Sequence, residues 1–147
     1  MSKRICVDSC LAIKWAFKED LEDEAVALLA LWKDARFIMP SSFFLECASI
    51  AYHKLLTGDT SLDSAALGLE TMDELQVQEI SPRDLMLPTA QLAHHLRITA
   101  WDAVYLAVAE AYDCDFWTVD ATLYRRARRL PFVNLLLPGF PDAPGPR

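Results

Sequence analysis

The chain has 147 residues, of which 53% are hydrophobic and 24% charged, and its net charge is −7. This length corresponds to about one domain and suffices to bury a core without disulfides or structural metals. The apolar content excludes a disordered chain, and 4 glycines and 8 prolines exclude collagen-like and low-complexity classes. No apolar run approaches the ~18 residues of a membrane helix, so we expect a cytoplasmic protein that does not enter membranes.

Short apolar runs alternate with longer helical patterns along the chain, which is typical of an α/β domain. The apolar runs predict strands at residues 4–7, 37–39, 77–80, 116–119 and 132–137. The helical patterns predict helices within 9–34, from 41–42 to about 57, over 62–75, from 81 onward, over 99–112 and over 121–129. Because strands separated by helices require crossover connections, we expect a central parallel sheet covered on both faces.

The second strand and two of the helices carry clear local signals. Pro40 is expected to end the strand, and Ser41 and Ser42 to cap the helix that follows. The helix over 62–75 is expected to bury one face, which carries Leu62, Ala66, Leu69, Met72 and Leu75.

The last ten residues differ in composition from the rest of the chain. Residues 138–147 contain four of the 8 prolines and two of the 4 glycines, a composition that offers little to pack. We therefore expect the folded domain to comprise residues 1–137 and residues 138–147 to form a mobile tail.

The cysteines give no metal or disulfide signal. Cys6, Cys10, Cys47 and Cys114 form no CxxC pair, and three of them lie in apolar surroundings. We expect reduced thiols, mostly packed in the core.

Four arginines cluster near the C-terminus of an otherwise acidic chain. An acidic protein is a poor general polyanion binder, because phosphate contacts depend on Lys and Arg. The cluster either contacts a phosphate backbone locally or forms a solvated helix face. Its members are Arg125, Arg126, Arg128 and Arg129.

Acidic residues follow the predicted strands at one edge of the sheet. Asp8 and Asp120 come directly after two strands, Glu46 lies in the first turns of the helix after another, and Asp102 lies in the first turn of the helix after Thr99. Because the carboxyl ends of parallel strands meet at one edge, where such folds bind ligands, the acids are expected to converge there.

Each acid also has a purely structural interpretation. Asp8 and Asp120 suit helix N-caps, and the pair Thr99 and Asp102 suits a capping box. Glu46 shares a helical stripe with Ser49 and His53 that could be solvated. A cluster is favoured for the set because all four acids stand in apolar sequence, which is typical of partly buried residues.

A cluster of buried acids requires a compensating charge. Two carboxylates about 5 Å apart repel by roughly 3 kcal/mol at an effective dielectric near 20. No Lys or Arg stands beside the acids in the segments ICVDSC, FFLECA, AWDAVY and WTVDAT. Sites made only of oxygen donors suit Mg²⁺, with Mn²⁺ as a possible substitute. Such ions polarise a water and neutralise the charge that builds up on a phosphodiester.

The acidic segments resemble a known family in their order and spacing. The segments VDSCLAIKW, MPSSFFLE, ITAWDAVYLAVAE and FWTVDATL resemble the PIN-domain family, and most of all the VapC toxins of toxin–antitoxin pairs. The resemblance covers residues 1–137. It implies a three-layer α/β/α fold with a central parallel sheet and the activity of a Mg²⁺-dependent endoribonuclease.

The resemblance also assigns roles to residues. It implies that Asp8, Glu46, Asp102 and Asp120 are the catalytic acids that bind the metal, and that Thr118 is a supporting hydroxyl. Relatives usually have Asn three residues after the glutamate, where this chain has Ser49. As partners the resemblance implies an RNA substrate, a small antitoxin protein that inserts a segment into the active-site groove, and a second copy of the chain in a homodimer.

Several alternatives remain open from the sequence. Ser9 either caps a helix or touches the acidic site, and Trp101 either packs in the core or flanks an RNA base. A PIN scaffold without catalytic activity, which only binds RNA or a protein, is disfavoured by the presence of all four acids. Phosphoryl transfer through Asp8 as a nucleophile is disfavoured because position 10 is Cys and Asp8 has no acidic neighbour.

Overall fold

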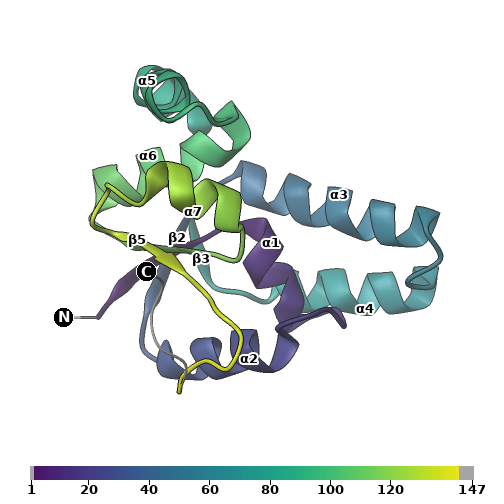
Figure 1. The fold of residues 1–147 in the computed structure, drawn as a ribbon. Coiled ribbons are helices and arrows are strands. Elements are labelled where there is room, and N and C mark those ends of the chain that lie inside the picture. The colour runs from purple at the N-terminus through teal and green to yellow at the C-terminus, as the bar shows by residue number, and fades with distance from the viewer. Residues whose placement is uncertain (1, 143–147) are drawn as a thin grey trace.

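The fold is a five-stranded parallel sheet with helices on both faces (Figure 1). It is seen in a computed structural model that describes residues 2–142. The strand order is β3-β2-β1-β4-β5, and every neighbouring pair is parallel. The strands are β1 (Arg4–Val7), β2 (Arg36–Pro40), β3 (Val77–Ile80), β4 (Asp115–Thr118) and β5 (Val133–Leu135). The predicted α/β class and the three-layer arrangement are therefore confirmed.

The helices connect successive strands as crossovers. In Figure 1, α2 lies below the sheet and α5, α6 and α7 lie above it. The helices are α1 (Ser9–Ala12), η1 (Ile13–Trp15), α2 (Glu22–Leu31), α3 (Ser42–Leu56), α4 (Leu62–Asp73), η2 (Pro82–Leu85), α5 (Met86–Leu96), α6 (Ala100–Tyr112) and α7 (Ala121–Ala127).

The central strand β1 is buried on both faces. Ile5, Cys6 and Val7 are fully buried, as expected of a strand in a parallel sheet that is covered on both sides. On one face, Trp32 at the end of α2 packs edge-on against the ring of Phe37 on β2. The same indole packs against Trp117 on β4. These aromatic contacts fix α2 on its face of the sheet.

Helix α6 covers the other face and is the most buried helix. All residues from Ala103 to Ala109 are buried. Three of these seven side chains are alanines, and their small size lets the helix axis approach β1 and β2 closely. This close packing fixes the start of α6, with Asp102, at the carboxyl edge of the sheet.

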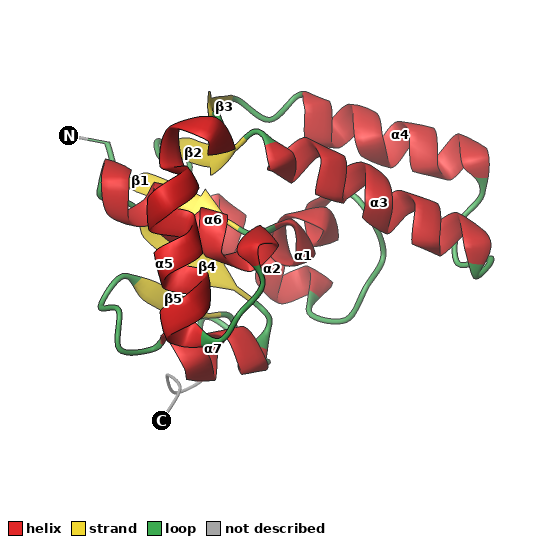
Figure 2. Ribbon diagram, turned by 90° about the horizontal axis from the view of Figure 1, so that it is seen from above, coloured by secondary structure: helices red, strands yellow, loops and turns green. Residues whose placement is uncertain are grey.

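Helices α3 and α4 form an antiparallel pair that extends away from the sheet (Figure 2). The predicted face of α4 is correct in part, because Met72 is buried and Leu69 and Leu75 pack against the core. Leu62 and Ala66 are exposed, and Ala65 and Gly68 are buried in their place. A Cβ atom at Gly68 would lie 2.5 Å from the ring of Phe17. Gly68 therefore leaves room for the Phe17 ring. A search for large apolar residues at helical spacing cannot detect a glycine at the centre of a buried face.

Several predicted boundaries are corrected by the structure. Pro40 belongs to β2, where it pairs with Ile80, because this pairing needs no N–H from residue 40. Ser41 precedes α3, but its side chain makes no capping hydrogen bond since its own backbone is already helical. The strand predicted at 116–119 begins and ends one residue earlier, and the strand predicted at 132–137 is only Val133–Leu135. Helix α7 ends at Ala127, so two of the clustered arginines follow it.

The C-terminal segment begins with turns rather than with a free chain. Residues 138–142 form turns, the ring of Phe140 packs edge-on against Trp117, and the Gly139 N–H donates to Glu24 at 3.3 Å. The rest of the predicted tail, residues 143–147, lies outside the described residues, so the mobile tail stays a prediction.

Two further expectations concern the whole chain. Cys6, Cys47 and Cys114 are buried free thiols, as predicted, whereas Cys10 is exposed. Within residues 2–142, no helix is long and apolar enough to cross a membrane.

Candidate active site

The predicted acids converge at the carboxyl edge of the sheet, where β1 and β4 lie side by side. This is the point at which the strand order changes direction, and such switch points form the ligand crevice of open α/β sheets. The charges of Asp102 and Glu46 act on Asp8, the charge of Asp120 acts on Asp102, and that of Asp102 acts on Glu46. All four carboxylates therefore belong to one electrostatic cluster.

Asp8 is the buried centre of this cluster. Its side chain is 4% exposed, and burial raises its pKa to about 7. Hydrogen bonds from the Thr118 hydroxyl and from the Leu11 N–H, at 3.0 Å, lower the pKa, while the charges of Asp102 and Glu46 raise it. The bond from Leu11 makes Asp8 the N-cap of α1. Asp8 is therefore a helix N-cap and also a member of the acidic cluster.

Thr118 ties the ends of the two central strands together. Its side chain is fully buried, and its hydroxyl donates to Asp8 Oδ2 and accepts from the Asp120 N–H at 3.0 Å. Asp120 caps α7 through Oδ1, which accepts from the N–H groups of Thr122 and Leu123 at 2.9 and 3.0 Å. Both capping bonds use Oδ1, so Oδ2 takes no part in the cap.

Glu46 is held from one side only. Its Oε2 accepts hydrogen bonds from the Ser9 hydroxyl at 2.7 Å and from the Tyr105 hydroxyl at 3.2 Å. Its Oε1 is buried and has no hydrogen-bond partner among the described residues. Burial raises the pKa of Glu46, and the charge of Asp102 raises it further. Ser9 therefore touches the site, and Glu46 does not lie on a solvated stripe.

Tyr105 is a site residue that the sequence did not reveal. Its ring lies in the core, is 1% exposed and is 6.1 Å from the ring of Phe116. Its hydroxyl, however, reaches Glu46. The available signal was its spacing, because Tyr105 follows Asp102 by three residues and so shares a face of α6.

Asp102 is half-buried at the start of α6. Its backbone N–H donates to Thr99 Oγ1 at 3.1 Å, which is the predicted cap. Burial raises the pKa of its carboxyl, and the charge of Asp120 adds to this effect, whereas a hydrogen bond with the Thr99 side chain opposes it. Asp102 and Asp120 together line an open cavity of about 340 Å³.

Two arginines share this cavity with the acids. Arg126 from α7 and Arg97 from the loop before α6 both line it, and Arg126 Nη1 donates to the Arg97 carbonyl at 2.8 Å. Arg97 was not predicted. Of the predicted cluster, Arg125, Arg128 and Arg129 are exposed and do not line the cavity.

Three other residues complete the comparison with the sequence. Ser49 is exposed on α3 and makes no hydrogen bond to the acids within the described part of the chain. Trp101 is 56% exposed, so the expectation that it packs in the core is wrong. Cys10 lies beside the cluster. Its side chain is exposed on one side, but desolvation by its neighbours and then the charges of Asp8, Glu46, Asp102 and Asp120 raise the pKa of its thiol.

The donor set of the cluster fits a hydrated divalent cation. No Lys or Arg forms a salt bridge with any of the four acids between residues 2 and 142. In the same residues, no three or more His, Cys, Asp or Glu side chains are close enough together to enclose an ion. Mg²⁺ is usually held by one or two carboxylates and several waters, and therefore needs no closed protein cage. The unpartnered Glu46 Oε1 is a free acceptor for such a water.

Comparisons with known proteins agree with this architecture. The model of the PIN domain family matches residues 5–129. The crystal structure of PAE2754 from Pyrobaculum aerophilum is similar with a TM-score of 0.62 at 18% sequence identity, over 85% of this chain and 79% of that one. At this identity the likeness shows the fold alone. No curated protein matches the sequence significantly.

The fold and the site define a parallel α/β domain with an acidic crevice at the carboxyl edge of its sheet. The chain belongs to the PIN domain family, whose fold is generally that of a nuclease.

The buried charge of Asp8 predicts an unusual pH dependence of stability. Because burial raises its pKa from 3.8 to about 7, the folded state binds more protons than the unfolded state between these values. Without metal, the free energy of unfolding should therefore fall as the pH rises from about 4 to about 8. At about 1.4 kcal/mol per pKa unit, Asp8 contributes at most about 4 kcal/mol to this change. Urea unfolding in the presence of a chelator measures it.

The substitution Asp8→Asn should remove most of this pH dependence and stabilise the metal-free protein at pH 8. Asp84→Asn, at an exposed carboxylate, is the matched control and should leave the profile unchanged. An Asp8→Asn protein that unfolds more easily than the wild type at pH 8 would contradict the buried, unpaired charge.

The Tyr105 hydroxyl predicts a second pH-dependent effect. Tyr105→Phe removes a hydrogen bond to a carboxylate, so it should destabilise the protein at pH 8 by about 1–2 kcal/mol. The loss should shrink at low pH, because a protonated Glu46 needs this donor less. Tyr112→Phe on the same helix is the control, and equal losses in both variants at both pH values would contradict the assignment.

Proposed function

We propose that the protein is a Mg²⁺-dependent endoribonuclease that hydrolyses RNA phosphodiesters with water. The observation that carries the proposal is the cluster of four acids at the switch point of a PIN domain, with no basic residue forming a salt bridge with any of them among residues 2–142. Such a cluster is unfavourable on its own and becomes favourable when a cation is bound.

The acids differ in how far they reach toward a substrate. Asp102 and Asp120 border the open cavity and would hold Mg²⁺, or Mn²⁺ in its place, where a phosphate can approach. Asp8 lies behind them and would contribute its charge from a position that Thr118 fixes. A bound metal would polarise a water and neutralise charge on the phosphodiester.

Glu46 would accept a proton from the attacking water molecule. Its Oε1 is free of protein hydrogen bonds, while Ser9 and Tyr105 hold the other oxygen in place. An acceptor that is oriented and has a raised pKa suits a general base for a water molecule. In this role Ser9 and Tyr105 are positioning residues.

The biological role that we propose is that of the toxin of a type II toxin–antitoxin system. The support is the resemblance of the acidic segments to VapC toxins together with membership of the PIN domain family. A small antitoxin protein would then block the crevice that holds the acids and Arg126. We further propose that the protein acts in the cytoplasm as a homodimer.

A second function is favoured by one observation. The described residues hold no preformed group of three metal ligands, which suits a catalytically silent PIN scaffold that binds RNA or a protein partner. The two proposals differ in whether the acids bind a metal ion, and this can be measured without any substrate.

Metal binding separates the two functions. If the acids bind Mg²⁺ or Mn²⁺, the metal should raise the melting temperature, because a ligand of the folded state stabilises it by mass action. Asp102→Asn should largely remove this shift and abolish cleavage of an unstructured RNA, while melting no lower than the wild type without metal. Asp63→Asn, in the first turn of α4, is the control at an exposed helix start. If neither Mg²⁺ nor Mn²⁺ changes the melting temperature of the wild type, the nuclease proposal is contradicted and the catalytically silent scaffold is favoured.

RNA binding should depend on the arginine beside the acids and not on its neighbours. Arg126→Ala removes a charge that lines the cavity, so it should weaken RNA binding and reduce the slope of log K against log salt by about one. Arg129→Ala, a control that also changes an exposed arginine, should have less effect. Equal slopes in both variants would show that the cavity does not hold the RNA backbone.

A further inference from the structure

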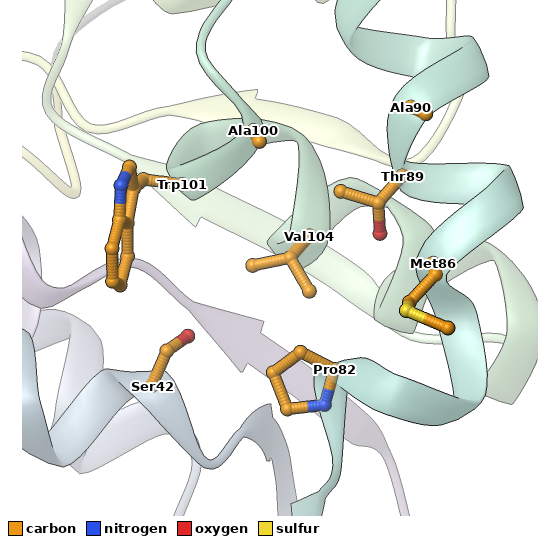
Figure 3. Close-up of a pocket in the computed structure, with 8 residues that line it drawn as sticks. All are labelled: Ser42, Pro82, Met86, Thr89, Ala90, Ala100, Trp101 and Val104. Carbon is orange, nitrogen blue, oxygen red and sulfur yellow. The ribbon is translucent and has the colours of Figure 1, made fainter.

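Two cavities lie beside the start of α6, and they differ in charge. The first encloses about 370 Å³ between α3, the segment of η2 and α5, and α6. Figure 3 shows the eight described residues that line it, among them Trp101, and none of the eight is charged. The second is the acidic cavity, which Asp102 and Asp120 share with Arg97 and Arg126. Of these two cavities, the acidic one alone offers cationic side chains to a negatively charged group.

Arg97 has a backbone conformation that arginine rarely adopts. It follows the last residue of α5 with a φ of 57° and a ψ of 45°, which is the left-handed region, and its N–H donates to the Ala93 carbonyl. Helix ends of this kind commonly carry glycine, because a Cβ atom makes the conformation unfavourable. Arginine at this position therefore lowers the stability of the helix end, and its side chain needs another explanation.

The end of α6 provides a direct comparison. Asp113 stands at the same position after α6, with φ and ψ both at 54°, and its N–H donates to the Ala109 carbonyl. Aspartate is among the few residues besides glycine that adopt this conformation readily. Asp113 precedes β4 and so lies at the opposite edge of the sheet from Asp120. The two helices end alike, and the arginine stands at the end that borders the acidic cavity.

The opposite charges in the acidic cavity remain apart. Within residues 2–142, neither Arg97 nor Arg126 forms a salt bridge with Asp102 or Asp120, although all four line the cavity. The Arg97 carbonyl accepts a hydrogen bond from Arg126 Nη1 at 2.8 Å, which fixes the peptide, while the Arg97 guanidinium has no partner among these residues. The space between the arginines and the acids suits a phosphodiester that meets a guanidinium on one side and a metal ion held by the acids on the other.

We propose that Arg97 binds a non-bridging oxygen of the phosphodiester that is cleaved and neutralises the charge that builds up there. The inference rests on the proposed ribonuclease function and adds to it a substrate-binding residue that is not an acid. A guanidinium suits this role because it stays protonated and can bind two phosphate oxygens at once. Arg126, which holds the Arg97 carbonyl, is a positioning residue in this arrangement.

The first test separates the charge of Arg97 from its backbone conformation. Arg97→Gly and Arg97→Ala both remove the guanidinium, but Arg97→Gly also relieves the unfavourable conformation. In thermal unfolding, Arg97→Gly should therefore melt about 2–4 °C above Arg97→Ala. In cleavage of an unstructured RNA with Mg²⁺, both variants should lose kcat/KM equally and by about tenfold or more, the usual loss for a hydrogen bond with a charged donor.

The second test locates the contact on the RNA. The probe carries, at its mapped cleavage bond, either the natural phosphodiester or a methylphosphonate, in which a methyl group replaces one non-bridging oxygen. Binding is measured by fluorescence anisotropy with chelator present, so that no cleavage occurs. Arg97→Ala should weaken binding of the natural RNA and reduce the slope of log K against log salt by about one. It should have much less effect on the methylphosphonate RNA, because both changes remove the same contact.

Two further variants are the controls. Arg97→Lys keeps the charge, so it should keep the salt slope and recover part of the lost kcat/KM, since a single amine cannot bind two phosphate oxygens in the same way. Asp113→Gly changes the equivalent residue at the end of α6 and should alter neither cleavage nor RNA binding.

Three results would overturn the inference alone. Wild-type kcat/KM and salt slope in both Arg97→Gly and Arg97→Ala would show that Arg97 only stabilises the negative end of α5. Equal losses of binding to the natural and the methylphosphonate RNA would place Arg97 at another phosphate. A larger loss of activity in Arg97→Ala than in Arg97→Gly would assign the effect to the fold. A wild type that neither binds nor cuts RNA would instead refute the proposed function as well.

Discussion

The burial of Asp8 without a cationic partner is the constraint on which the rest of the site depends. A charge at the end of the central strand is expensive to remove from water, and the fold offsets part of this cost with hydrogen bonds from Leu11 and Thr118. Thr118 can reach Asp8 only because β1 and β4 are direct neighbours in the sheet. Strand order, the buried hydroxyl and the raised pKa of Asp8 are thus parts of one arrangement.

Asp8 and Asp120 each cap a helix and also belong to the acidic cluster, and this dual use explains why local sequence rules could not separate the two roles. Asp120 accepts from the N–H groups at the start of α7 with one oxygen only, and the residue also lines the acidic cavity. Helix starts carry partial positive charge, which favours acidic groups there. A parallel sheet places these helix starts at one edge. The topology of the sheet therefore brings helix-capping acids close together at that edge.

The sequence predicted the residues whose place follows from their position at the end of a strand. It did not predict the residues that reach the site through tertiary packing. Strand-terminal acids could be placed because Asp8 and Asp120 directly follow apolar runs and parallel strands end at a common edge. Tyr105 and Arg97 join the site through a hydroxyl and a loop whose directions only the packed structure defines. The buried face of α4 was predicted only in part: Met72 was placed correctly, but Gly68, which packs under the Phe17 ring, has no hydrophobic side chain that a pattern could detect.

The neighbourhood of β1 and β4 also has a consequence during synthesis. Asp8 and Thr118 are 110 residues apart, so the bond between them closes one of the longest loops in the chain. A nascent chain that has passed β3 already carries Asp8 and Glu46 but not the strand that completes the crevice. The acidic edge can therefore assemble only after β4 has left the ribosome and entered the sheet. Chains released before that point lack the crevice.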